Sequence, residues 1–235
     1  MNGLSEIRED GGTLHLGAMV RHADVAAHPL IQRSYGLLAD AARNIGDPQV
    51  RNRGTLAGSL VHADPSAELP LLAVALDATF HLRSAQASRS VAAKDFYQGY
   101  LLTDITPDEL LVTADFYLPP AHCGWCCTEV ARRQGDFAIV AVAVLLGCGR
   151  DRTIDFARVA IGGAGPAPLR VTAAEDTLVG ERPDAQLFHR VGDVSAQAVE
   201  PPNDIHASSN YRRHLAGVLV RRALTTAESR ISGRA

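Results

Sequence analysis

The segment from Ile45 to Pro70, IGDPQVRNRGTLAGSLVHADPSAELP, limits the fold of this chain more than any other stretch. It is too polar and too rich in glycine for a core element, and it is too long for a simple turn. A long irregular segment inside a compact domain is usually a binding loop. We therefore expect an irregular loop here that carries part of a ligand site.

Pro119-Pro120 is the clearest domain boundary in the 235 residues. Two consecutive prolines remove two backbone donors and disfavour helix in the residue before them. A chain of this length forms one large domain or two small ones. We predict domains at 1–120 and 121–235.

Hydrophobic periodicity predicts an α+β fold. Before the prolines it indicates strands at 13–18, 79–83, 90–92 and 109–118, and helices at 21–27, 30–44, 69–76 and 95–101. After them it indicates strands at 128–135, 139–147 and 154–161, then helices at 173–178, 185–199 and from Ser208 or Ser209 onward. The second domain should thus hold a three-stranded antiparallel sheet and helices. The last helix places Arg212, Arg213, Arg221 and Arg222 at polar positions, which are typical of a solvated face.

Composition and motifs exclude several classes of function. The net charge of -3 gives no indication of a nucleic-acid partner. No apolar run approaches the roughly 20 residues of a membrane span, and MNGLSEIRED lacks the layout of a signal peptide, so we expect a cytoplasmic protein. No nucleophile–base motif is present and the nine histidines are scattered, so we expect no catalytic side chain and no metal site.

Three cysteines cluster at Cys123, Cys126 and Cys127. A C-x-x-C pair is compatible with a redox centre or with half of a zinc site. The redox interpretation requires a helix after the pair, whereas a strand-like run follows. The zinc interpretation requires a second ligand pair, whereas only Cys148 remains. Reduced thiols beside the interdomain linker are the favoured interpretation.

The small residues of the long segment suit a diphosphate, because backbone N–H groups must approach the phosphate closely. The hydroxyls of Thr55 and Ser59 can donate as well, while Leu56 can anchor the loop in the core. Asp64 or Glu68 could accept hydrogen bonds from ribose or ribityl hydroxyls. The candidate diphosphate residues are Gly54, Thr55, Leu56, Ala57, Gly58 and Ser59. A simple turn is the alternative interpretation of such a loop.

The same segment resembles the second flavin loop of the FAD-binding medium subunit of molybdenum hydroxylases, the family of the carbon monoxide dehydrogenase medium subunit and the xanthine dehydrogenase FAD domain. Further landmarks of that family occur in order along the chain. They are FYQGY at 96–100, PDELL at 107–111, ARRQGDFA at 131–138, VAIGG at 159–163 and YRRHL at 211–215.

This resemblance implies an FAD-binding domain of the molybdopterin-dehydrogenase (PCMH-like) type, followed by a small C-terminal domain. The flavin would take electrons from iron–sulfur clusters on a small 2Fe-2S subunit, which a large molybdenum-cofactor subunit fills, and would pass them to an external acceptor. By position, Thr55 to Ser59 would contact the diphosphate and Glu68 the ribityl chain. Ile45 and Leu111 would pack on the flavin or its adenine end. Thr128 stands where some relatives place a lysine near the flavin.

The family's first subdomain, with a Gly-Gly loop of the AGGQSL type, has no counterpart, since residues 1–7 are similar to a point beyond it. The resemblance therefore implies a half-built flavin site, either because the true start lies upstream or because the chain is a truncated paralogue. A flavin-free subunit with a structural docking role is the alternative function. A stand-alone flavin oxidase fits less well, since the later landmarks are of the hydroxylase type.

Overall fold

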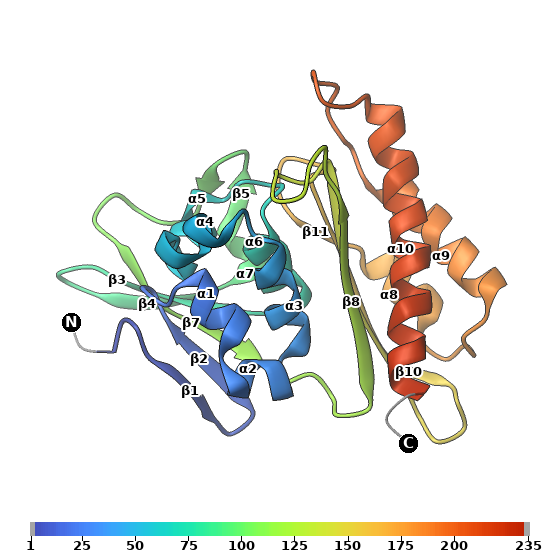
Figure 1. The fold of residues 1–235 in the computed structure, drawn as a ribbon, viewed down its shortest axis with the longest axis horizontal. Coiled ribbons are helices and arrows are strands. Elements are labelled where there is room, and N and C mark those ends of the chain that lie inside the picture. The colour runs from blue at the N-terminus through green and yellow to red at the C-terminus, as the bar shows by residue number, and fades with distance from the viewer. Residues whose placement is uncertain (1–2, 233–235) are drawn as a thin grey trace.

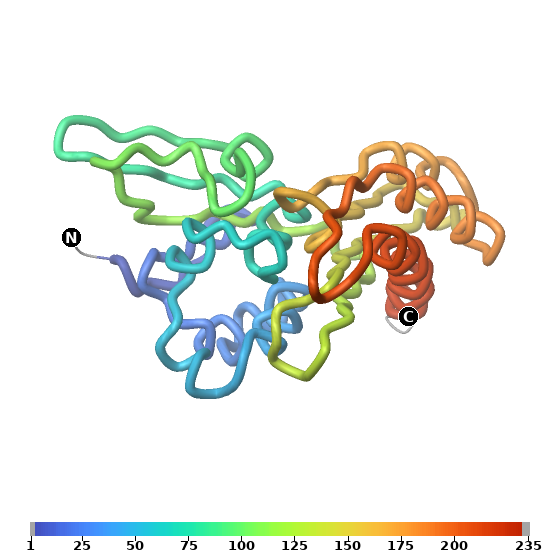
Figure 2. The backbone as a smooth tube through the Cα atoms, turned by 90° about the horizontal axis from the view of Figure 1, so that it is seen from above, coloured from blue at the N-terminus to red at the C-terminus, as the bar shows by residue number. Residues whose placement is uncertain are grey.

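Two antiparallel sheets, each packed against helices, organise the chain (Figure 1). The computed structural model describes residues 3–232. Residues 233–235 lie outside this range, and so do Met1 and Asn2, which open the segment likened to a later part of the family's flavin domain. The N-terminal and C-terminal halves lie side by side (Figure 2). Among the described residues, no helix is long and apolar enough to span a bilayer.

The first sheet has five strands in the order β1-β2-β7-β3-β4. Its predicted strands are confirmed, and one further strand, β1, was not predicted. The bounds are β1 Ile7–Asp10, β2 Thr13–Gly17, β3 Thr79–Arg83, β4 Ser88–Ala92 and β7 Leu110–Tyr117. Alternate residues of β2, such as Leu14 and Leu16, are fully buried, so one face of this sheet packs on the core.

The segment at 45–70 is helical, so the expectation of an irregular loop was wrong. It forms α4 (Pro48–Arg53) and α5 (Leu56–His62) and leads into α6 (Glu68–Ala75), which confirms the helix predicted at 69–76. Asp47 caps α4 by accepting the N–H of Val50 at 2.9 Å, with Pro48 in the first turn. Each of the first two helices spans fewer than two turns, and short connections separate all three helices.

Two other predicted helices are divided. The helix expected at 30–44 is split by Tyr35 into α2 (Pro29–Ser34) and α3 (Gly36–Asn44), and it follows α1 (His22–Ala27). The helix expected at 95–101 is the short α7 (Ala93–Phe96) followed by a hairpin of β5 (Tyr97–Gly99) and β6 (Leu102–Thr103). Phe96 and Tyr97 pack edge-on against Phe80, which fixes this change of direction.

The second sheet has the order β11-β10-β9-β8. Three long antiparallel strands were expected, and a two-residue fourth strand joins them at the edge. The bounds are β8 Cys123–Val130, β9 Val140–Cys148, β10 Ile154–Gly162 and β11 Leu169–Arg170. The first strand therefore begins before the predicted residue 128 and includes the cysteines. Three helices follow, α8 Thr172–Leu178, α9 Ala185–Ala198 and α10 Ser209–Ser232.

Strand β9 is buried on both faces. Ala141 and Ala143 belong to the core shared with the N-terminal half, whereas Val142 and Val144 belong to the core beneath α10. The second sheet is thus a middle layer, with α3 and α6 on one side and α8 to α10 on the other (Figure 1). This double burial explains the continuous apolar run of β9.

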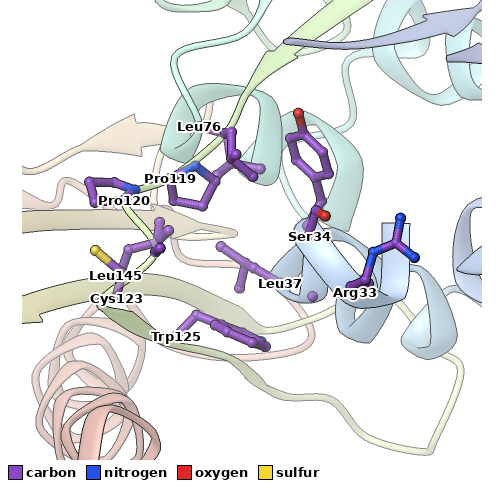
Figure 3. Close-up of a pocket in the computed structure, with 13 residues that line it drawn as sticks. Arg33, Ser34, Leu37, Leu76, Pro119, Pro120, Cys123, Trp125 and Leu145 are labelled. Carbon is purple, nitrogen blue, oxygen red and sulfur yellow. The ribbon is translucent and has the colours of Figure 1, made fainter. Parts of the chain in front are cut away.

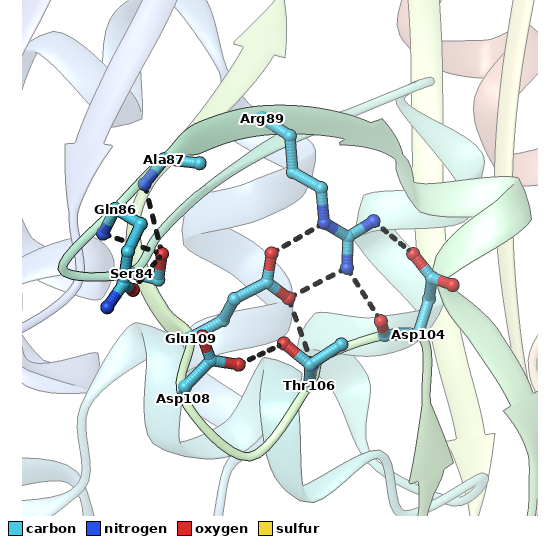
Figure 4. A network of polar contacts seen from close by, with 8 residues as sticks. All are labelled: Ser84, Gln86, Ala87, Arg89, Asp104, Thr106, Asp108 and Glu109. Carbon is cyan, nitrogen blue, oxygen red and sulfur yellow. Dashed lines mark hydrogen bonds and ion pairs between the residues drawn. The ribbon is translucent and has the colours of Figure 1, made fainter.

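A cluster of charged side chains fixes the connection between β6 and β7 (Figure 4). Arg89 of β4 binds both oxygens of Glu109, and it also binds the carboxylate and carbonyl of Asp104. Glu109 also accepts the N–H of Thr106 at 2.9 Å. The Arg89 guanidinium and the Thr106 N–H lower the pKa of the Glu109 carboxyl to about 2. These bonds hold the loop that follows the β5–β6 hairpin.

Candidate functional site

The start of α5 carries the residues expected to cradle a diphosphate. Thr55 is the N-cap, and its hydroxyl accepts the N–H of Gly58 at 3.2 Å. The N–H of Leu56 donates to the carbonyl of Val20 at 2.8 Å, and the N–H of Ala57 donates to that of Ala18 at 3.1 Å. The N–H groups of Leu56, Ala57 and Gly58 are therefore already bonded within the chain. The structure does not contain the expected open cradle of N–H groups at these three residues.

The start of α5 can still contact a ligand through its small residues and its side-chain hydroxyl groups. Gly58 is exposed, and Thr55 and Ser59 are partly exposed, so their side-chain hydroxyls can reach a ligand. Glycine at position 54 is required by packing, because a Cβ there would lie 2.5 Å from the His22 ring. Leu56 is fully buried and anchors the helix in the core, as predicted.

The turn after α5 joins the two halves of the molecule. Ala63 ends the helix with a φ of 56°, and Asp64 then accepts the N–H of Ser66 at 2.8 Å. The carbonyl of Pro65 accepts the N–H of Gly163, at the end of β10, at 2.8 Å. Gly163 has a φ of 72°, and a Cβ there would lie 2.7 Å from the carbonyl oxygen of Ile139. Only glycine fits this position without strain.

Glu68 begins α6 and is only 8% exposed. Burial raises the pKa of its carboxyl to about 7; its own backbone N–H opposes the shift, and the nearby Glu129 and Asp64 reinforce it. Glu129 of β8 also has a raised pKa because it is buried, and its Oε2 has no hydrogen-bond partner among the described residues. Two carboxyl groups thus lie at the domain interface, where their protonated forms can donate a hydrogen bond to a ligand.

The direction of side chains along β8 explains why Glu129, and not Thr128, lies near Glu68. A Cβ on Gly124 would meet the carbonyl of Ala227 in α10, so the even-numbered residues of this strand face α10. The odd-numbered Trp125 packs against the N-terminal core, and Glu129 shares that face. Thr128 therefore faces α10, away from the residues expected at the flavin.

A cleft of about 690 Å³ opens where the α5–α6 turn meets the β8–β9 loop. Both halves of the chain line it. Its charged and polar residues are Asp64, Ser66, Arg132, Asp136, Asp204, His206 and Arg212, and its exposed apolar residues are Tyr100, Leu101 and Phe137. The large apolar area is typical of a surface that binds a ligand or a partner.

Arg212 supports one wall of this cleft from inside. It is 5% exposed and donates to the carbonyls of Ile139 and Gly163 and to Asp204. The N–H of Ala207 and the Arg212 guanidinium lower the pKa of the Asp204 carboxyl to about 2. The prediction that Arg212 lies on a solvated helix face was therefore wrong, because this residue of the first turn of α10 is buried and bonded to backbone carbonyls of the fold.

The structure places the predicted site residues in three locations: the start of α5, the region beyond its other end, and the hydrophobic core. Thr55 to Ser59 lie at the start of α5, and Asp64 and Glu68 lie beyond its other end, about 10 Å away for a helix of this length. Asp64 borders the cleft. Ile45 is 9% exposed and Leu111 is 5% exposed, so both side chains belong mainly to the core.

Sequence reasoning missed Glu129, Arg132 and Arg212 as site residues. The run ARRQGDFA at 131–138 was the available signal, since it forms the β8–β9 loop and ends against Arg212. Gly135 of this loop approaches the N-terminal half closely, because a Cβ there would lie 3.0 Å from the carbonyl oxygen of Gly46. The loop is thus part of the interface between the halves.

The cysteines lie within strands, and the first three follow closely after the Pro119-Pro120 linker. Cys123, Cys126 and Cys127 belong to β8, and Cys148 ends β9; no disulfide joins any of the four within residues 3–232. Burial raises the pKa of Cys126 and of Cys127, which disfavours the reactive thiolate. Within residues 3–232, no group of three or more His, Cys, Asp or Glu side chains is placed to hold a metal ion.

Comparison with known proteins gives the same order of parts. Residues 1–119 match the model of the FAD binding domain in molybdopterin dehydrogenase, and residues 125–227 match that of the CO dehydrogenase flavoprotein C-terminal domain. The nicotine 6-hydroxylase medium subunit of Paenarthrobacter nicotinovorans is 36% identical over 97% of this chain and 80% of its own length. The carbon monoxide dehydrogenase medium chain of Hydrogenophaga pseudoflava is 32% identical over 97% and 79%.

Solved structures agree. A carbon monoxide dehydrogenase from Hydrogenophaga pseudoflava matches with a TM-score of 0.94 and 34% identity, over 98% of this chain and 80% of that chain. Quinoline 2-oxidoreductase from Pseudomonas putida 86 matches with a TM-score of 0.92 and 33% identity, over 99% and 80%.

The fold and the matched domains define a flavoprotein component of an oxidoreductase. The α+β class and the two kinds of domain predicted from the sequence are confirmed. The chain belongs to the FAD-binding medium subunits of the molybdenum hydroxylases, the family of carbon monoxide dehydrogenase and xanthine dehydrogenase. FAD is the cofactor of this family.

Proposed function

We propose that this chain holds FAD along α5 and at the domain interface, and that it passes electrons from iron–sulfur clusters to an external acceptor. The observation that carries the proposal is the cleft of about 690 Å³, which both halves line beside Asp64 and close to Glu68. A small 2Fe-2S subunit would supply the electrons, and a large molybdenum-cofactor subunit would fill its clusters. The medium-subunit names of two relatives support these partners.

The residues present fit such a cofactor. The buried Oε2 of Glu129 has no partner in residues 3–232, and Glu68 can donate a proton near neutral pH, so both suit a ligand with hydroxyl and carbonyl groups. Arg132 lines the cleft and can balance phosphate charge. Bound FAD would supply the electron acceptor and donor, while these side chains would bind and orient it.

The other predicted contacts belong to the same proposal. Gly54 to Ser59 would contact the diphosphate through small residues and hydroxyls, and Ile45 and Leu111 would support the loop from the core. We also propose that the chain divides into an FAD-binding domain at 1–120 and a C-terminal domain at 121–235. We further propose a cytoplasmic location, since no disulfide joins the four cysteines among the described residues, as is usual where the surroundings are reducing.

Flavin binding is tested by titrating the whole chain with FAD and following flavin absorbance and fluorescence. Arg132→Gln should weaken binding by about tenfold or more, the loss expected for one charge-assisted hydrogen bond. Arg133→Gln is the matched control, because Arg133 is exposed like its neighbour Arg132 but does not line the cleft. A wild-type chain that ignores FAD would refute the proposal, and equal affinities of the two variants would exclude the assigned role of Arg132.

The electron route is tested in the assembled complex. Co-expression with the large and small subunits should yield a complex that contains molybdenum, iron and flavin by elemental and absorbance analysis. Reduced small subunit should then bleach the bound flavin, and an added acceptor should restore its absorbance. A complex in which reduced clusters leave the flavin oxidised would contradict the route, even if FAD is bound.

A further inference from the structure

A second cavity lies at the other end of β8 from the cleft. Its volume is about 180 Å³, and Trp125 of β8 forms one wall. Leu37 comes from α3, Leu145 from β9 and Pro119-Pro120 from the linker between the halves (Figure 3). The N-terminal half, the linker and the C-terminal half therefore all contribute walls.

The size and walls of this cavity suit one aromatic ring. A cavity of about 150 Å³ with aliphatic and aromatic walls is enough to bind benzene. The polar edge of Trp125 is already satisfied, because its Nε1 donates to Asp40 at 3.2 Å. The Arg230 guanidinium lies 5.4 Å from the centre of the Trp125 ring. Arg230 and Gly36 pack against parts of the indole, and the part that lines the cavity remains for contact with a ligand.

Arg33 supplies a charge at the edge of this cavity. It lines the cavity and is exposed to solvent, so the cavity reaches the surface beside it. Its side chain forms no hydrogen bond or ion pair with any residue in the range 3–232. By contrast, the nearby Arg43 and Arg230 both bind the carboxylate of Asp40. A guanidinium without a side-chain partner, beside a cavity that has several apolar walls, favours a carboxylate, which can accept two parallel N–H bonds.

We propose that this cavity is a binding site for a small aromatic monocarboxylate, with the ring between Leu37, Trp125 and Leu145 and the carboxylate on Arg33. The site is independent of the flavin function proposed above, since none of the residues assigned to FAD lines it. A ligand here would contact both halves and their linker. It would therefore hold the interface at the end of β8 that is remote from the cleft.

The single tryptophan of the chain makes the test direct, because tryptophan fluorescence reports on Trp125 alone. The whole chain is titrated with benzoate and, separately, with the uncharged benzyl alcohol. Benzoate should change the fluorescence saturably, and benzyl alcohol should bind about tenfold or more weakly, the loss expected for one charge-assisted hydrogen bond.

Arg33→Gln should lower the benzoate affinity by about the same factor. Arg190→Gln is the matched control, since Arg190 is an exposed arginine of α9 that does not line the cavity, and it should leave the affinity unchanged. No saturable response to benzoate would overturn the proposal. Equal binding of benzoate and benzyl alcohol would overturn the proposal too, and so would equal benzoate affinity of the wild type and Arg33→Gln. The comparison of benzoate with benzyl alcohol uses the wild-type chain alone, so it does not depend on whether a variant folds.

Discussion

Replacing Glu68 by glutamine should stabilise the protein in a pH-dependent way. Glu68 is 8% exposed at the domain interface, and burial raises the pKa of its carboxyl from 4.5 to about 7. The folded state therefore holds a proton that the unfolded chain releases at a lower pH. The stability due to this proton is complete below pH 4.5 and is lost as the pH rises through about 7.

The magnitude follows from the size of the shift. One pKa unit corresponds to about 1.4 kcal/mol, so a shift from 4.5 to about 7 makes ionised Glu68 cost about 3 kcal/mol in the folded state. Glutamine has nearly the same shape and stays neutral at every pH. Glu68→Gln should therefore lie within about 1 kcal/mol of wild type near pH 5 and should be about 3 kcal/mol more stable near pH 8.

Urea unfolding of the flavin-free chain at both pH values measures this difference. The matched control is Glu200→Gln, since Glu200 is exposed and its replacement should change the free energy of unfolding little at either pH. If Glu68→Gln gives the same stability change at both pH values, the carboxyl is not held protonated by burial and the reasoning fails. A loss of stability near pH 8 would show that ionised Glu68 has a favourable partner.

Three further substitutions test the interface and the caps. Gly163→Ala should destabilise by more than about 1 kcal/mol in urea unfolding, because a φ of 72° and a carbonyl 2.7 Å from the new Cβ oppose it; unchanged stability would contradict this. Asp47→Ala should cost about 1 kcal/mol through the lost cap of α4, whereas Asp47→Asn should cost much less. Arg212→Met should cost roughly 3–5 kcal/mol, because it leaves buried carbonyls and Asp204 unpaired; a loss below 1 kcal/mol would refute the supporting role.

Strands were predictable where one face or both faces are buried. The alternation in β2 and the continuous apolar run of β9 each follow from their surroundings. Helices α4 and α5 were missed although Asp47-Pro48 and Thr55 are helix-start signals, whereas the apolar run at 69–76 correctly predicted α6. Gly46 and Gly54 suggested a loop, but they separate short helices whose stability comes from packing, not from their own propensity.

The chemical state of the site could not be predicted, because it depends on contacts between distant residues. The N–H groups of Leu56 and Ala57 are occupied by carbonyls of Val20 and Ala18, and nothing in the local sequence indicates such partners. The side chain that faces Glu68 depends on which residues of β8 point toward the N-terminal half. A strand predicted to start at 128 instead of Cys123 gives no basis for choosing Glu129 over Thr128.

The halves meet through backbone groups close to the site, and this has a consequence for how the site is held. Gly163 donates to Pro65, and Gly135 lies against Gly46, so two glycines set the separation of the halves. Short backbone contacts allow less adjustment than long side chains, since any added Cβ forces the chains apart. The half-buried Glu129 is therefore kept near Glu68 by the backbone itself, although burial disfavours ionisation of both carboxyls. Carboxyl groups that burial keeps protonated, held in place by close backbone contacts, are typical of a functional site, and this favours the interface over the start of α5 as the centre of the proposed FAD site.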